Sequence, residues 1–144
     1  QRKVTLWGLA YKAQTDDIRD SPAIPLVQAL IPRGIEVRCH DPEAAHNFRM
    51  HVTNDILCFN NEYDALAGSD LLIVMTEWRH LRSPDFSRIK QLMNTPRILD
   101  ARNIWSRESV EAHGFVYQGV GAGFTGSTSF GHDVGHSWFD SFSV

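Results

Sequence analysis

The sequence predicts an α/β fold of three layers, in which a parallel sheet of about six strands carries helices on both faces. Short apolar segments alternate with amphipathic segments along the 144 residues, and most of the links between them are short. Residues 71–75 are five apolar residues in a row, which is typical of a central strand buried on both faces of a parallel sheet. Because parallel strands need right-handed crossovers, the helices between them must cover the faces of the sheet.

The first elements are predicted from apolar runs and helix-capping residues. Residues 3–9 are expected to form a strand. A helix is expected at 22–31, because Ser21 suits its N-cap, a proline suits its first position, and apolar residues recur at helical spacing. A proline and a glycine then end this helix, and residues 35–40 are the next expected strand.

The middle of the chain is more polar and predicts shorter elements. Residues 43–50 are expected to form a surface helix, residues 56–59 a strand, and residues 63–67 a short helix that a glycine ends. The strand at 70–75 follows. If the strands take the usual order 3-2-1-4-5-6, this strand lies beside the first strand, at the point where the order reverses.

The last predicted elements complete the alternation. Apolar residues lie along one side of an expected helix at 85–93, and residues 97–100 lead into a strand. Ser106 suits the N-cap of a helix that ends at His113 before a glycine, and residues 115–120 are the last expected strand.

One domain is expected at 1–120, followed by a tail at 121–144. The tail is rich in Gly, Ser, Phe and His and has no helical or strand periodicity, so we expect it to be flexible or to be ordered by a partner. Gln1 runs almost directly into a strand, which is what a domain cut from a longer chain would show.

Composition excludes several classes of protein. The net charge of −3 argues against a nucleic-acid-binding protein, which normally carries a basic excess. No apolar run approaches the roughly 18 residues of a membrane helix, and the start of the chain has no signal-peptide pattern. Cys39 and Cys58 lack the spacing of a disulfide framework or a zinc site, so the cytosol is the expected compartment.

Two long, charged loops predict the position of a binding site. Connections between strands and helices usually have about 2 to 6 residues, whereas the loops at 9–20 and 76–84 are longer. Both leave the carboxyl ends of strands, where ligands bind in open parallel sheets. If those two strands are neighbours, the loops converge on one crevice.

Three cations in or near these strand ends are candidates for binding. Lys12 follows the first strand and can offer a compact positive charge to an anion, although it could equally be a solvated loop lysine. Arg102 follows the strand at 97–100 and offers a planar fork that suits phosphate or ribose. Arg19 lies among aspartates, so an ion pair that orders the loop is the alternative to a binding role, and Asp17 is expected to position the loop.

Two residues after the central strand are weaker candidates. Trp78 could stack on a base, but an aromatic residue at a strand end more often fills the core, which is the role that we favour. Glu77 would repel a diphosphate, so we expect it to have a role in the loop or in hydrogen bonding instead.

Two further motifs are rejected. The segment Gly121 to Gly126 matches Gly-x-Gly-x-x-Gly, but no helix pattern and no second strand with an acidic residue follow it. His132 and His136 have the spacing of two metal ligands on a helix, but the glycine between them disfavours a helix and no third ligand is evident. We therefore predict no metal site.

Several segments together resemble the C-terminal, nucleotide-sugar-binding domain of the UDP-glucose/GDP-mannose dehydrogenase family, over roughly residues 3–121. The resemblance is closest to the UDP-glucose 6-dehydrogenase branch. The segments that carry it are Gly8 to Pro22, His40-Asp41-Pro42, Ala67 to Asp70, Thr76-Glu77-Trp78, Ser83 to Phe86, Asp100 to Asn103 and Gly114-Phe115.

This resemblance implies roles for particular residues. Tyr11 and Lys12 stand where the family's Phe-Lys pair contacts the nucleotide sugar, and Arg102 stands at an arginine that contacts the substrate, sometimes across a subunit boundary. Arg19 matches an arginine that reaches the NAD held by another domain. The family's catalytic cysteine lies in a region upstream of the part matched here, so Cys39 does not inherit its role and no catalytic residue is expected in this chain.

Two functions from different classes follow. The first is the UDP-binding domain of an NAD-dependent UDP-glucose 6-dehydrogenase, which converts UDP-glucose to UDP-glucuronate with two hydride transfers. Its expected partners are a UDP-sugar, the N-terminal and central domains of the same enzyme, and further copies in a homo-oligomer. The second is a non-catalytic module derived from this domain that binds a nucleotide or another protein.

Overall fold

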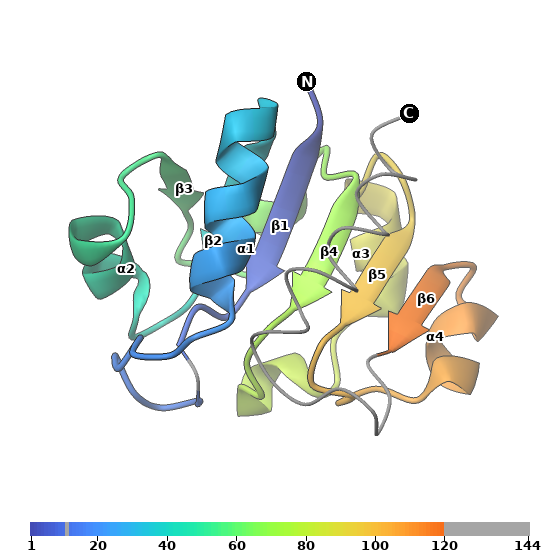
Figure 1. Cartoon of the computed structure of the whole chain (residues 1–144). Coiled ribbons are helices and arrows are strands. Elements are labelled where there is room, and N and C mark those ends of the chain that lie inside the picture. The colour runs from blue at the N-terminus through green and yellow to red at the C-terminus, as the bar shows by residue number, and fades with distance from the viewer. Residues whose placement is uncertain (11, 120–144) are drawn as a thin grey trace.

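The computed structural model describes residues 1–10 and 12–119, and in them it confirms the predicted three-layer fold. Six parallel strands form one sheet in the order β3-β2-β1-β4-β5-β6 (Figure 1). The strands are β1 (Lys3–Trp7), β2 (Glu36–His40), β3 (Ile56–Cys58), β4 (Leu71–Val74), β5 (Arg97–Asp100) and β6 (Val116–Gly119). The first strand therefore lies beside β4, as predicted.

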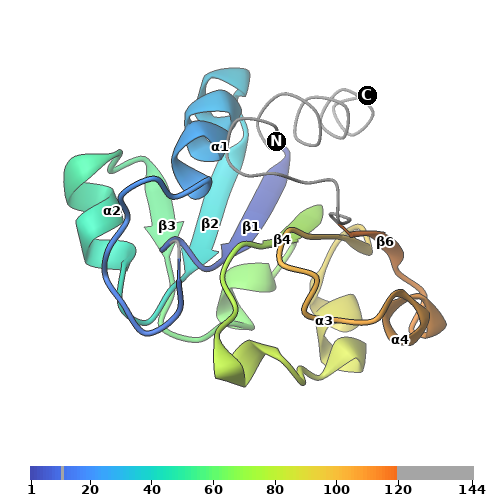
Figure 2. The same cartoon turned by 60° about the horizontal axis from the view of Figure 1, so that its bottom comes forward.

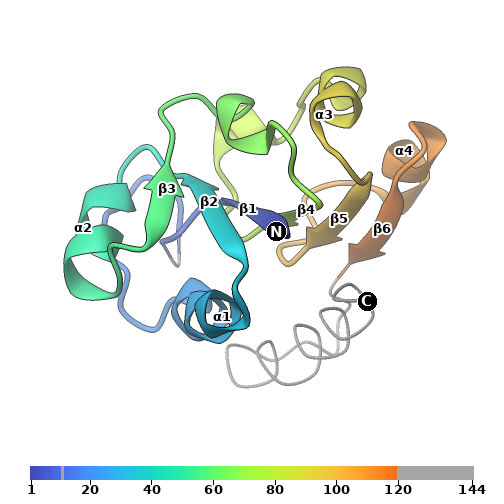
Figure 3. The same cartoon turned by 90° about the horizontal axis from the view of Figure 1, so that it is seen from above.

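Helices cover both faces of the sheet. Seen from above, α1 and α2 lie on one face and α3 and α4 on the other (Figure 3). The helices are α1 (Ala23–Leu30), α2 (Ala45–His51), α3 (Phe86–Leu92) and α4 (Arg107–Ala112), with 3₁₀ turns η1 (Ile31–Arg33), η2 (Asp64–Leu66) and η3 (Arg79–Leu81). None of the helices in the described ranges has the length and apolar character that a membrane crossing needs.

The sequence-based boundaries differ most from the structure in three places, while other element ends shift by one or two residues. The helix expected at 22–31 ends at Leu30 and continues as η1, because Pro32 cannot donate a backbone hydrogen bond. The helix expected at 63–67 is only the 3₁₀ turn η2, and η3 lies inside a loop for which no helix was predicted. Short 3₁₀ turns lack the periodicity from which longer helices are predicted.

The core has two halves, one on each face of the sheet. Alternating residues of each strand point to opposite faces, so Leu6 packs under α1 and α2 while Trp7 packs toward α3 and α4. All four residues of β4 are 0% exposed, which confirms the predicted central strand. At the amino edge of the sheet, Asp70 accepts a hydrogen bond from the Lys3 backbone N–H at 3.0 Å and so joins β4 to β1.

The carboxyl edge of the sheet is the end that faces the two long loops. The last strand residues lie side by side there, since Trp7 pairs with His40 and with Val74, and Val74 pairs with Asp100. Figure 2 brings this edge toward the viewer and shows the loops that leave it.

Candidate functional site

One buried carboxylate organises the start of the Lys12 loop. Asp41 follows β2 and is 5% exposed. Its Oδ2 accepts hydrogen bonds from the backbone N–H groups of Leu9 (2.7 Å) and Ala10 (3.2 Å). Its Oδ1 accepts from the N–H groups of Glu43 (2.9 Å) and Ala44 (2.8 Å), at the approach to α2. A single side chain therefore ties the end of β1 to the segment after β2.

Gly8 allows the chain to turn away from β1 at close range to β4. Its φ of +101° lies in the region that residues with a side chain rarely adopt, and a Cβ there would overlap the side chain of Thr76. The Thr76 hydroxyl donates to the Ala10 carbonyl at 2.7 Å, so the bases of the two long loops are joined.

Beyond their bases the two loops lie apart. Asn47 of α2 donates to the Asp16 carbonyl at 3.0 Å, and Figure 2 shows the loop at 9–20 beside α2. The loop at 76–84 instead packs Leu81 among the core residues that lie toward α3 and α4. The predicted convergence on one crevice therefore holds only where the loops leave the sheet.

Lys12 lines a cavity within its own loop. The cavity measures about 410 Å³ and is bordered by Lys12, Ala13, Thr15, Asp17 and Arg19. It brings two of the predicted cations to one hollow, with one carboxylate beside them. Such a hollow can accept an anion that competes with Asp17 for the guanidinium.

Arg19 is paired locally, which is the alternative to a binding role that the sequence predicted for it. Its Nε and Nη2 donate to Asp17 Oδ1 and Oδ2 at 3.0 and 2.8 Å, and the Arg19 side chain is 86% exposed. The hydrogen bonds from Arg19 lower the pKa of Asp17 to about 2. The guanidinium is thus held in place by the loop while remaining open to solvent.

Arg102 is held at the carboxyl edge by Glu77. The Arg102 Nη2 donates to Glu77 Oε1 at 3.3 Å, and Glu77 Oε2 also lies 3.7 Å from Nη2 of Arg82. The hydrogen-bonding role predicted for Glu77 is confirmed. One carboxylate is therefore shared by two guanidinium groups at this edge.

The backbone around Arg102 rests on a buried aspartate. Asp100 is 0% exposed, and its Oδ2 accepts from the Trp105 N–H and from the Tyr117 hydroxyl, each at 3.0 Å. Its Oδ1 accepts from the Arg102 N–H at 3.1 Å. Burial and the adjacent Asp100 carboxylate raise the pKa of Tyr117, so the phenol remains a donor. Sequence reasoning missed the roles of Asp41 and Asp100, although an aspartate at the end of a strand or directly after it is a known turn signal.

Comparison with known proteins shows the family to which the chain belongs. Residues 5–107 match the family model described as the UDP-glucose/GDP-mannose dehydrogenase family, UDP binding domain. The chain belongs to this family. It is 39% identical over 125 residues to a UDP-glucose 6-dehydrogenase of Pseudomonas aeruginosa and 43% identical over 119 residues to one of Rhizobium meliloti. Those alignments cover 83% of this chain but only 28% and 27% of the two relatives.

Solved structures have the same fold. The UDP-D-ManNAc dehydrogenase of Pyrococcus horikoshii superposes with a TM-score of 0.65 at 29% identity, over 85% of this chain and 26% of that one. A UDP-glucose dehydrogenase of Pyrobaculum islandicum gives a TM-score of 0.67 at 24% identity, over 82% and 25%. The chain thus spans about a quarter of the length of these relatives, and it corresponds to the UDP binding domain of the family.

The family's predicted substrate residues are only partly described by the structure. Lys12 and Arg102 both lie at the carboxyl edge, after β1 and after β5. Within the described ranges, Arg102 is not among the residues that line the Lys12 cavity. Tyr11, the Gly121 to Gly126 segment and the pair His132 and His136 lie outside the described residues, so the predictions made for them are untested.

Trp78 has the core role that the sequence favoured. It is 7% exposed and belongs to the apolar cluster that packs toward α3 and α4, together with Leu81 and Trp105. A base cannot stack on a ring whose faces are covered in this way. Trp78 instead packs the start of the loop at 76–84 against this core cluster.

Two side-chain clusters at the carboxyl end of β2 were not predicted. Cys39 and Cys58 pair in register across β2 and β3, and their Sγ atoms lie 2.8 Å apart as free thiols. His40 Nε2 lies 2.9 Å from His80 Nε2. Burial lowers the pKa of His80, against the opposing effect of the Glu62 carboxylate. These contacts depend on strand pairing and loop paths, which residue spacing does not reveal.

Proposed function

We propose that this chain is the nucleotide-sugar-binding domain of an NAD-dependent UDP-glucose 6-dehydrogenase, which converts UDP-glucose to UDP-glucuronate. The observation that carries the proposal is the match of 39% and 43% identity, across 83% of the chain, to proteins of that name. The cation-lined cavity of the Lys12 loop and the arginine at the end of β5 supply groups that suit a diphosphate.

The work of this domain in the reaction is positional. Lys12 and Tyr11 contact the nucleotide sugar, and Arg102 holds the phosphate or ribose by its planar fork. Holding the UDP portion fixes where the sugar's C6 lies, and remote binding energy of this kind supports orientation at the reacting atom. No catalytic group is assigned here, and Cys39 is unsuited to be a nucleophile because it is 0% exposed.

The cofactor of the proposed reaction is NAD, which accepts the hydride. Arg19 fits a cofactor contact because its guanidinium is 86% exposed and already held by Asp17, so it can face an anionic group of NAD. The remaining contacts to NAD belong to other domains of the same enzyme, which are proposed as partners because the relatives are more than three times as long as the matched segment. The enzyme is proposed to act in the cytoplasm as a homo-oligomer, and its free thiols suit a reducing compartment.

Calorimetry with UDP on the 144-residue chain tests this function. We expect saturable heat in the wild type and at least tenfold weaker binding in Lys12→Ala and in Arg102→Ala. The matched controls are Lys90→Ala, at the end of α3, and Arg33→Ala, in η1 at the opposite edge of the sheet; both side chains are exposed. Absence of heat at millimolar UDP in a sample shown to be folded contradicts the proposal. Equal losses in the control variants contradict the assigned residues.

A further inference from the structure

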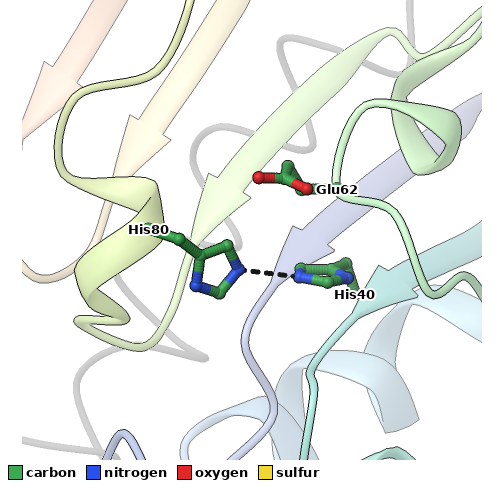
Figure 4. A group of neighbouring side chains, drawn as sticks. All are labelled: His40, Glu62 and His80. Atoms are coloured by element: carbon green, nitrogen blue, oxygen red, sulfur yellow. Dashed lines mark hydrogen bonds between the residues drawn. The ribbon is translucent and has the colours of Figure 1, made fainter.

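Three potential metal ligands meet at the carboxyl edge of β2. His40 is the last residue of β2, Glu62 lies in the loop before η2, and His80 lies in η3 (Figure 4). One donor atom from each lies within 4.8 Å of the other two. His40 is buried, Glu62 is half-buried and His80 is exposed. The cluster is therefore buried on the side of His40 and accessible to solvent on the side of His80.

The hydrogen bonding of His40 favours a ligand role. Its Nδ1 lies 3.0 Å from the Phe59 carbonyl, which can only accept a hydrogen bond, so Nδ1 carries the proton. The Nε2 lone pair then points at His80 Nε2, 2.9 Å away. Histidines that bind metals commonly donate their second ring N–H to a carbonyl or carboxylate in this way.

The position of Glu62 is also fixed through its backbone. The indole N–H of Trp7 donates to the Glu62 carbonyl at 3.0 Å, and Trp7 is itself fully buried. The Glu62 side chain is only half-buried and can change rotamer. Its carboxylate can therefore approach the two imidazoles without movement of the chain.

We propose that His40, Glu62 and His80 bind one divalent transition-metal ion, for which Zn²⁺ is the best match. Two imidazole nitrogens and one carboxylate oxygen are a ligand set of open zinc sites, where water takes the fourth position. With Zn–N distances of about 2.0–2.1 Å, two nitrogens on a tetrahedral ion lie roughly 3.3 Å apart. The present 2.9 Å between the Nε2 atoms requires the rings to separate by only a few tenths of an ångström.

Metal binding requires the proton between the two imidazole rings to move from His80 Nε2 to His80 Nδ1. In the metal-free protein His80 Nε2 donates to His40 Nε2, since the latter is unprotonated. When the ion binds, His80 carries its single proton on Nδ1, and both Nε2 lone pairs face the metal. The ligand set then has two neutral imidazoles and one carboxylate, which leaves a net charge of about +1 with a divalent ion.

This site joins three separate segments of the fold. The end of β2, the loop before η2 and η3 come from distant parts of the sequence. An ion that binds all three only in the folded state stabilises the chain in proportion to the logarithm of its free concentration. This inference is independent of the proposed UDP binding, because none of its ligands is assigned to the nucleotide.

Titration of the 144-residue chain with ZnCl₂ tests the site by calorimetry and by melting temperature. The double variant His132→Ala/His136→Ala serves as background, because those histidines could bind metal on their own. In that background we expect one Zn²⁺ per chain, a higher melting temperature with zinc, and visible absorption bands of tetrahedral cobalt when Co²⁺ replaces it. His80→Ala is expected to weaken binding at least tenfold, and Glu62→Gln to weaken it less.

Two controls separate this site from other ligands. His51→Ala removes an exposed histidine at the end of α2, and Cys58→Ser removes a thiol from β3; neither is expected to change zinc affinity. No zinc binding in the folded background variant overturns the proposal. Zinc affinity that survives both His80→Ala and Glu62→Gln, or that is lost with Cys58→Ser, overturns it as well.

Discussion

At the scale of single residues, buried aspartates decide where the charged groups of the carboxyl edge stand. Asp41 receives four backbone N–H groups and Asp100 receives two together with a phenol. Hydrogen bonds to a charged acceptor contribute about 1.5–3 kcal/mol each, more than bonds between neutral groups. Lys12 and Arg102 lie at the surface. Their positions depend on Asp41 and Asp100, which hold the backbone of Leu9 and Ala10 and of Arg102.

The thiol pair of β2 and β3 gives a residue-scale prediction on pH. The hydrogen bond from the Cys39 thiol lowers the pKa of Cys58, while giving that bond and being buried raise the pKa of Cys39. Cys58 is half-buried beside a cavity of about 580 Å³ next to α2. Because the thiolate is the nucleophile, iodoacetamide should label Cys58 at a lower pH than an ordinary thiol and leave Cys39 unlabelled until the chain unfolds.

Mass mapping of the labelled peptide across a pH series measures this. Cys39→Ala removes the donor, so the labelling of Cys58 should shift to higher pH in that variant, with circular dichroism as the check on folding. Equal labelling of both thiols in the native wild type contradicts the assignment of the donor.

At the scale of elements, the seam between β1 and β4 depends on close approach at Gly8. In Gly8→Ala the new Cβ would overlap the Thr76 side chain and lie 2.8 Å from the Thr76 backbone nitrogen, at a φ of +101°. We expect unfolding free energy to fall by about 2–4 kcal/mol, from backbone strain together with overpacking. The two long loops share this seam, so UDP binding should weaken as well.

Gly34 offers a matched control for this substitution. Its φ is +77°, but a Cβ there would meet nothing within 4 Å. Gly34→Ala should therefore cost only the conformational strain, about 1–2 kcal/mol. Urea unfolding of both variants measures the difference. Equal losses of unfolding free energy would show that the overlap with Thr76 does not destabilise the Gly8 variant.

At the scale of the whole molecule, the sequence predicts layers and edges better than contacts. Strand order follows from crossover rules and from the apolar run of β4, so the placement of Lys12 and Arg102 at the carboxyl edge could be foreseen. The meeting of His40 with His80, and of Cys39 with Cys58, could not, because it depends on strand register and on loop paths. The separation of the Lys12 cavity from Arg102 was missed for the same reason.

The whole molecule also gives a way to separate packing from binding. Trp78 is 7% exposed in the core, so Trp78→Ala should lower stability by about 3–5 kcal/mol through the cavity that it leaves. Arg102 is a partly exposed cation, and Arg102→Ala should change stability little while removing a UDP contact.

Melting temperatures with and without UDP distinguish the two roles. A ligand present at 100 times its dissociation constant stabilises the folded state by about 2.7 kcal/mol, and this increment does not depend on the starting stability. Trp78→Ala should therefore have a lower melting temperature without UDP but keep the stabilisation by UDP. Trp78→Phe should recover part of the stability lost without UDP. Arg102→Ala should melt near the wild-type temperature without UDP and lose most of the stabilisation by UDP. If Trp78→Ala also lost the increment while remaining folded, the indole would belong to the nucleotide site and not only to the core.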